Sequence, residues 1–166
     1  MEPRSIHFIL NRPTGTPHTM ARVKIPLPAS FVFETRLDVR ISDINYGNHM
    51  ANDAILRFAH EARVRFLTSC GYSELDVEGF GIIMADAAIS YKAEVFHGST
   101  LRLRIGLSDF SRHGVDLIYQ AIDGSTGKEV ARLKTGIVFF DYENRKLALI
   151  PHRFLVRFQA QPEGAS

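Results

Sequence analysis

The sequence predicts an α+β fold in which one curved antiparallel sheet wraps around one long helix. Three observations predict it: an early segment that alternates with a period of two, a long amphipathic segment after it, and only strand-like segments beyond. Each of these elements has an apolar side, and a sheet curved around a single helix buries all of them in one core. A chain of 166 residues is long enough for one domain with such a core.

The first two elements are the most regular in the chain. From Phe31 to Ser42, apolar and polar residues alternate, as in a half-buried strand. A helix is expected at about residues 52–69, because apolar residues recur there at steps of three and four. These are Ile55, Phe58, Ala59, Ala62 and Phe66. Asn52 or Asp53 is expected to cap the first turn, and Gly71 to end the helix in the left-handed conformation.

The rest of the chain predicts a run of four or five antiparallel strands. The segment from Gly81 to Val95 is long and mostly apolar, which is typical of a central strand covered on both faces. Further strands are expected at 101–107, 115–121 and 130–140, followed by a short one that ends at Pro151. The open edges of such a sheet expose unpaired backbone groups. We therefore expect a homo-oligomer, a dimer or a tetramer of dimers, with a groove between subunits.

Residues 1–19 differ from the remainder, because they are turn-rich and show no sustained period. Met20 then resembles a natural start. We expect residues 1–19 to be an extension outside the native domain, and residues 20–166 to form a single domain.

Composition excludes several functional classes. The net charge is +2 and no run of five like charges occurs, so the sequence predicts neither a nucleic-acid partner nor binding to a membrane surface. No apolar stretch reaches the roughly 20 residues of a membrane span, and no signal-peptide core is visible, so a cytoplasmic location is expected. Cys70 is the only cysteine, which excludes an internal disulfide and favours a structural role.

One stretch, between the first strand and the helix, is rich in groups that do acid–base chemistry. It contains Asp43, Asn45, Tyr46, Asn48, His49, Asn52 and Asp53. Unpaired N–H groups at the helix start could polarise a substrate carbonyl, and Gly47 permits close backbone approach. The alternative is an ordinary polar loop of turn-formers and caps. No set of metal ligands with zinc spacing occurs, so no metal site is predicted.

The run VRISDINYGNHMANDAILRFAHEAR resembles the signature of 4-hydroxybenzoyl-CoA-type hot-dog thioesterases, roughly VR-x-x-D-x-D-x-x-G-H-V-N-N followed by a helix ending in E-x-A-R. The matching residues are Val39, Arg40, Asp43, His49, Asn52, Glu61, Ala62 and Arg63. The resemblance extends over about residues 31–151, including Ile89 to Lys92 and the Gly136 to Asp141 strand. It implies a hot-dog fold and the hydrolysis of acyl-CoA or acyl-carrier-protein thioesters, without a cofactor.

The sequence departs from that signature at the family's second aspartate, which is Asn45 here. An amide can neither accept a proton nor form an acyl anhydride at neutral pH, so another group must act as the base. In a first hypothesis, His49 is the base and is oriented by Asp43 or Asp53. In a second, Asn45 positions the water while a carboxylate elsewhere, such as a buried Asp86 with a raised pKa, takes the proton. In a third, the domain binds thioesters without hydrolysing them.

For substrate binding we expect Tyr91 and Lys92 at the end of the long apolar strand, with Tyr46, Gly47 and Asn48 from the loop. Tyr91 could stack or donate a hydrogen bond, and Lys92 could bind a phosphate. The predicted function is a thioesterase. A hot-dog dehydratase or hydratase and a non-catalytic acyl-thioester-binding domain are the alternatives.

Overall fold

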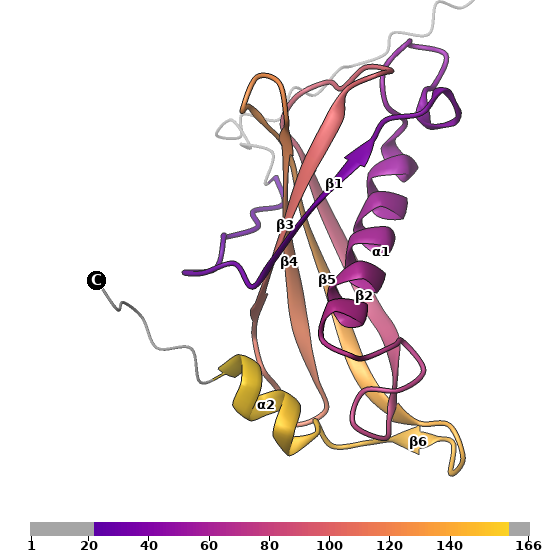
Figure 1. Cartoon of the computed structure of the whole chain (residues 1–166), viewed down its shortest axis with the longest axis vertical. Helices are drawn as coiled ribbons and strands as arrows, with labels where there is room; N and C mark the ends of the chain where they lie inside the picture. The colour runs from indigo at the N-terminus through magenta and orange to yellow at the C-terminus, as the bar shows by residue number, and fades with distance from the viewer. Residues whose placement is uncertain (1–21, 160–166) are drawn as a thin grey trace, which may run out of the picture.

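The computed structural model describes residues 22–159, which fold into one antiparallel sheet, a long helix against it and a short C-terminal helix (Figure 1). The strands are β1 (Phe33–Asp38), β2 (Gly81–Tyr91), β3 (Thr100–Ser108), β4 (Gly114–Asp123), β5 (Glu129–Asp141) and β6 (Lys146–Leu147). The helices are α1 (Asn52–Ser69) and α2 (His152–Gln159). The strand order is β1-β3-β4-β5-β2, with β6 beside β5. This arrangement confirms the predicted α+β hot-dog fold.

The core lies between α1 and the sheet, where the period of each element aligns its apolar residues. On β3, Leu101, Leu103 and Ile105 are fully buried, because a period of two places all three on the helix-facing side. On α1, three alanines are equally buried, and their small side chains allow the helix to lie close to the sheet. They are Ala54, Ala59 and Ala62.

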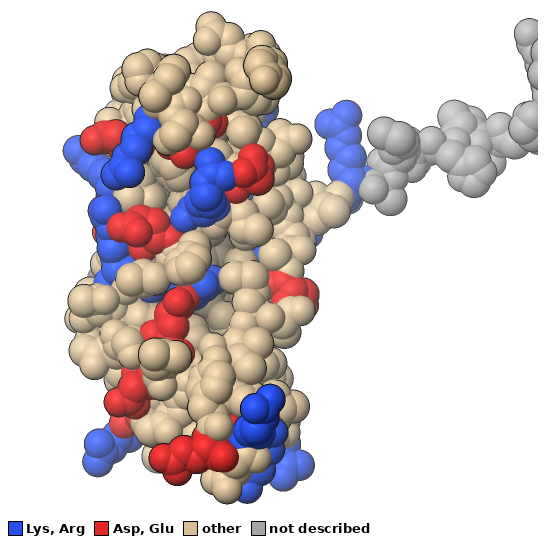
Figure 2. All heavy atoms as spheres, turned by 90° about the vertical axis from the view of Figure 1, so that its right-hand side faces the viewer, with Lys and Arg blue, Asp and Glu red and all other residues tan. Residues whose placement is uncertain are grey.

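Helix α1 has the predicted bounds, but its N-terminal cap differs from the prediction. The N-cap is Ala51, with no side-chain hydrogen bond, because Asp53 pairs with Arg57 along the exposed face instead. The predicted stop is confirmed, since Gly71 has φ +82° just after the helix. Glu61 pairs with Arg65 one turn further along. Figure 2, which faces the side of the molecule where α1 lies, shows such positive and negative side chains next to one another.

Strand β2 occupies an edge of the sheet and not its centre, which corrects the prediction for Gly81–Val95. It pairs with β5 on one side, and no described strand pairs with its other side. Its apolar residues are also not all covered, since Ile83 and Met84 are 37% and 39% exposed.

The two ends of the described chain also differ from the prediction. After the two-residue strand β6, the chain forms α2 and not a short final strand, and Phe154 of α2 packs edge-on against Phe139 with ring centroids 5.3 Å apart. At the other end, residues 22–32 lie against the sheet, where Ile25 is buried and its carbonyl accepts a hydrogen bond from Arg132. The expected extension, residues 1–19, lies outside the described residues. None of the helices described here is long and apolar enough to span a membrane.

Candidate active site

The polar stretch forms a tight turn that delivers His49 to the beginning of α1. The N–H of Asn45 donates to the carbonyl of His49 (2.9 Å), and the N–H of Asn48 donates to the carbonyl of Asn45 (3.0 Å). Asn48 has φ +60°, a left-handed conformation that asparagine tolerates better than most residues. The turn closes within five residues, so its side chains are fixed relative to the helix start.

The imidazole of His49 is held at its Nδ1 atom by neighbouring residues of the same turn. Its Nδ1 lies 3.2 Å from the carbonyl oxygen of Met50 and 3.4 Å from Nδ2 of Asn45. In one tautomer Nδ1 donates to Met50, which leaves Nε2 as the basic nitrogen; in the other it accepts from Asn45. The Asn45 amide is itself fixed, since its Oδ1 accepts the N–H of Gly47 (2.8 Å).

Gly47 is required at this turn for steric reasons. A Cβ added at Gly47 would lie 2.9 Å from Nε2 of His49 and 3.1 Å from Oδ1 of Asn45. Either contact would displace the imidazole or its amide neighbour. The group that approaches Gly47 closely in this structure is the ring of His49, and the approach of a thioester to its backbone stays a prediction.

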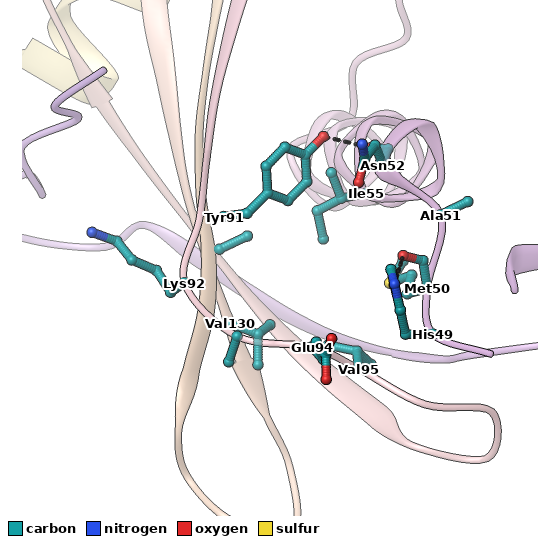
Figure 3. Close-up of a pocket in the computed structure, with 12 residues that line it drawn as sticks. His49, Met50, Ala51, Asn52, Ile55, Tyr91, Lys92, Glu94, Val95 and Val130 are labelled. Atoms are coloured by element: carbon teal, nitrogen blue, oxygen red, sulfur yellow. Dashed lines mark hydrogen bonds between the residues drawn. The ribbon is translucent and has the colours of Figure 1, made fainter. Parts of the chain in front are cut away.

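A cavity of about 290 Å³ lies between the start of α1 and the end of β2 (Figure 3). It brings together three of the predicted site residues, His49, Tyr91 and Lys92. The phenol of Tyr91 donates to the carbonyl oxygen of Asn52 (2.7 Å), which joins the strand end to the first turn of the helix. Burial, and then the charge of Asp53, raises the pKa of Tyr91 above its ordinary value. The other lining residues are Met50, Ala51, Asn52, Ile55, Ala93, Glu94, Val95, Val130 and Ala131.

Glu94 is the functional candidate that the sequence reasoning missed. The N–H of Met50 donates to the carbonyl of Val95 (2.7 Å), so the His49–Met50 and Glu94–Val95 segments lie side by side at one wall of the cavity. The sequence shows only that Glu94 is an acidic residue at the end of the apolar Gly81–Val95 run, just beyond the predicted binding pair Tyr91 and Lys92. Glu94 is exposed to solvent.

Neither aspartate expected to orient His49 contacts it. Asp43 is buried, accepts the N–H of Arg40 (3.0 Å) and pairs with Arg57 at 3.2 Å. Asp53 pairs with the same guanidinium, and the hydrogen bond that Arg57 donates to Asp43 is the main cause of the raised pKa of Arg57. In this chain the two carboxylates fix Arg57, because an arginine fork can bind both at once.

The remaining predicted residues lie elsewhere. Tyr46 is fully exposed, and neither it nor Gly47 or Asn48 lines the cavity. Asp86 is not the buried carboxylate with a raised pKa that the sequence suggested. Its hydrogen bond with Lys134 (2.8 Å) lowers its pKa, because β2 is an edge strand and leaves Asp86 exposed beside that ammonium.

Among residues 22–159, no group of three or more His, Cys, Asp or Glu side chains is arranged to hold a metal ion. In the first turn of α1, the N–H groups of Asn52, which lines the cavity, and of Asp53 have no hydrogen-bond acceptor in the described part of the chain. They lie at the positive end of the α1 dipole, where developing negative charge is stabilised.

Comparison with known proteins gives a family and a fold. A family model described as "Thioesterase-like superfamily" matches residues 39–158. The 1,4-dihydroxy-2-naphthoyl-CoA thioesterase from Synechocystis is similar in structure, with a TM-score of 0.69 and 21% identity over 78% of this chain and 96% of that one. The DHNA-CoA thioesterase from Staphylococcus aureus has a TM-score of 0.64 and 16% identity, covering 75% and 81%. A gentisyl-coenzyme A thioesterase has a TM-score of 0.65 and 18% identity, covering 74% and 98%. No curated protein matches the chain.

Proposed function

Because the chain belongs to the thioesterase-like superfamily, we propose that it hydrolyses acyl-CoA thioesters to a free acid and CoA. The family match supports thioester hydrolysis, and the choice of CoA as the thiol carrier is the proposal. The single observation that carries it is the cavity that His49 and Glu94 line together with Asn52 in the first turn of α1. Lys92 supports CoA as the carrier, because this lining residue directs its exposed ammonium away from His49 and Tyr91 (Figure 3), where it suits a phosphate group of the thiol outside the cavity.

In the proposed mechanism, water attacks the thioester carbonyl carbon while Nε2 of His49 accepts a proton from that water. The carbonyl oxygen becomes an oxyanion, and the free N–H groups of Asn52 and Asp53 stabilise it at the positive end of α1. The tetrahedral intermediate then collapses, the bond between carbon and sulfur breaks, and the His49 imidazolium returns its proton to the departing CoA thiolate. Atoms and charge balance without a cofactor.

Asn45 is proposed as a positioning residue in this scheme. Its amide lies 3.4 Å from Nδ1 of His49 and is fixed by the N–H of Gly47, so it restrains the imidazole without exchanging protons. Asp43 and Asp53 are proposed to act one step further away, through Arg57, by holding the loop against α1. Glu94 is proposed as a second acid–base group that shares the water with His49.

The outer residues of the turn are proposed to contact the CoA portion of the substrate. Tyr46 is fully exposed and offers an aromatic face to a nucleotide base. Gly47 and Asn48 support the same surface through their backbone. The substrate names of the similar structures, dihydroxynaphthoyl-CoA and gentisyl-CoA, justify including aromatic acyl groups among those tested.

The test follows free thiol release from a panel of aliphatic and aromatic acyl-CoAs and from an acyl carrier protein. We expect turnover of acyl-CoA, with kcat reduced about 100-fold or more in His49→Ala, because general-base catalysis contributes roughly 10²–10⁴. The matched control is His60→Ala, an exposed histidine on α1 outside the cavity, which should retain the full rate. Turnover of the acyl carrier protein alone would refute acyl-CoA as the substrate. A near-normal rate in His49→Ala would refute His49 as the general base.

A second function is favoured by one observation, the amide of Asn45 where related thioesterases place a carboxylate. A domain of this kind could bind acyl-CoA without hydrolysing it. Tight binding of acyl-CoA by calorimetry, with no thiol released by the wild-type protein, would support the binding function over the enzymatic one.

A further inference from the structure

The cavity has two chemically different sides. His49 and Glu94 lie on one side, and Tyr91 lies on the other, with Ile55 between them (Figure 3). Much of the remaining lining is apolar, including Met50, Ile55, Val95, Val130 and Ala131. A thioester whose carbonyl lies at His49 would therefore extend its acyl group over an apolar surface toward Tyr91.

Tyr91 is held in place at the far side of that surface. Its ring runs from the end of β2 to the first turn of α1, and its hydroxyl donates to the carbonyl oxygen of Asn52 (2.7 Å). Directly after it, the N–H of Lys92 donates to the carbonyl of Val130 (2.8 Å), which fixes the backbone on β5. The phenol is thus anchored at both ends, by its hydroxyl and by its main chain.

We propose that Tyr91 is the specificity-determining wall of the acyl site, which limits how far an acyl group can reach from the thioester carbonyl. This inference rests on the proposed function, because it needs the carbonyl at His49. Each methylene group that enters the apolar part of the cavity should raise kcat/KM about four-fold. The gain should end at the length where the acyl chain meets the Tyr91 ring, since overpacking then opposes binding.

The experiment measures kcat/KM for a series of straight-chain acyl-CoAs from acetyl to dodecanoyl, with benzoyl-CoA and naphthoyl-CoA beside them. In Tyr91→Ala the acyl-chain length with the highest kcat/KM should increase by at least two methylene groups. For the shortest acyl chain that the wild type rejects, kcat/KM should rise ten-fold or more. Tyr91→Phe keeps the ring but loses the bond to Asn52. Its optimum should stay in place while discrimination against longer chains falls several-fold.

The matched control is Tyr142→Ala. Tyr142 and Tyr91 are each 51% exposed, but Tyr142 packs on Phe140 outside this cavity, so its loss should leave the length profile unchanged. An unshifted optimum in a folded Tyr91→Ala protein would overturn the inference. A uniform change of KM at all lengths would overturn it too, because Tyr91 would then contact the CoA portion.

Failure of the proposed function gives a different result. If the wild-type protein releases no thiol from any acyl-CoA, hydrolysis is refuted. Affinities of non-hydrolysable acyl-thioether analogues of the same lengths, measured by calorimetry, then decide the role of Tyr91 by the same shift in optimum length.

Discussion

Arg63 is a charged residue buried beneath the exposed ion pairs of α1. Its side chain is 6% exposed, and its guanidinium binds Glu74, in the segment between α1 and β2, at 2.7 Å. Its Nη1 has no hydrogen-bond partner among the described residues. Burial also raises the pKa of Tyr119, whose hydroxyl pairs with Thr135 in the core. The helix therefore carries a cation on its inner side, and Glu74 is the carboxylate that compensates it.

Removing Glu74 should destabilise the protein far more than removing an exposed carboxylate. Glu74→Ala leaves the Arg63 guanidinium buried without its partner, and we expect a loss of about 2 kcal/mol, since Glu74 itself is 33% exposed. The matched variant, Glu61→Ala, breaks the exposed pair with Arg65 and should cost less than about 0.5 kcal/mol. Urea unfolding of both variants measures the difference. Equal losses of unfolding free energy in the two variants would show that the ion pair with Glu74 does not stabilise the buried Arg63.

Sequence reasoning located part of the candidate site at the residue scale. It chose His49, Tyr91 and Lys92, which the fold gathers around one cavity although about 40 residues separate the loop from the strand end. It missed Glu94, because only the hydrogen bond between Met50 and Val95 shows that Glu94 lies beside His49. It misjudged Asp86, whose exposure depends on which strand forms the sheet edge.

At the scale of elements, the turn between β4 and β5 is built around one carboxylate. Oδ1 of Asp123 accepts hydrogen bonds from the N–H and hydroxyl groups of both Ser125 and Thr126. These bonds hold the pKa of Asp123 at about 2, below its ordinary value of 3.8. The turn is short, so this one side chain organises most of its polar groups.

Because the folded state lowers the pKa of Asp123, its stabilisation is complete above about pH 5 and is lost as the pH falls toward 2. Asp123→Ala should cost about 1 kcal/mol at pH 7, since water screens the partly exposed carboxylate. The difference in unfolding free energy between wild type and variant should fall by about half at pH 3. Guanidinium unfolding at pH 7, 5 and 3 measures it. A constant difference across this range would contradict the assignment.

Periodicity predicted the elements whose environment is set by neighbours in sequence. Helix α1 has the expected bounds, and β3, β4 and β5 form where alternation indicated strands. The apolar content of β2 suggested a central strand, yet strand order depends on long-range pairing that one segment's pattern does not contain. Helix α2 was missed because its eight residues bury only Phe154 on a face formed by the rest of the fold.

At the scale of the whole molecule, the outer edge of β2 has backbone hydrogen-bonding groups that no described strand pairs with. β2 has eleven residues, whereas β1 at the opposite edge has six. In the part of the chain that is described, no strand covers the outer edge of β2, where Ile83 and Met84 are partly exposed. A long apolar edge of this kind promotes pairing with another strand. A second copy of the chain offers an identical strand, so two-fold pairing through β2 would satisfy both edges at once.

We expect the protein to form a homodimer through β2, with a solution mass twice the 18.7 kDa of one chain. Met84→Asp places a carboxylate at this edge and should raise the dimer dissociation constant at least ten-fold, because two copies would bring like charges together in a desolvated interface. Leu149→Asp, at a residue that is 54% exposed and lies outside β2, is the matched control and should leave the dimer intact. Light scattering over a dilution series gives the dimer dissociation constants of the wild type and of both variants. Circular dichroism verifies that each variant is folded. A monomeric wild type, or a Met84→Asp protein that dimerises as tightly as the control, would show that another surface joins the subunits or that none does.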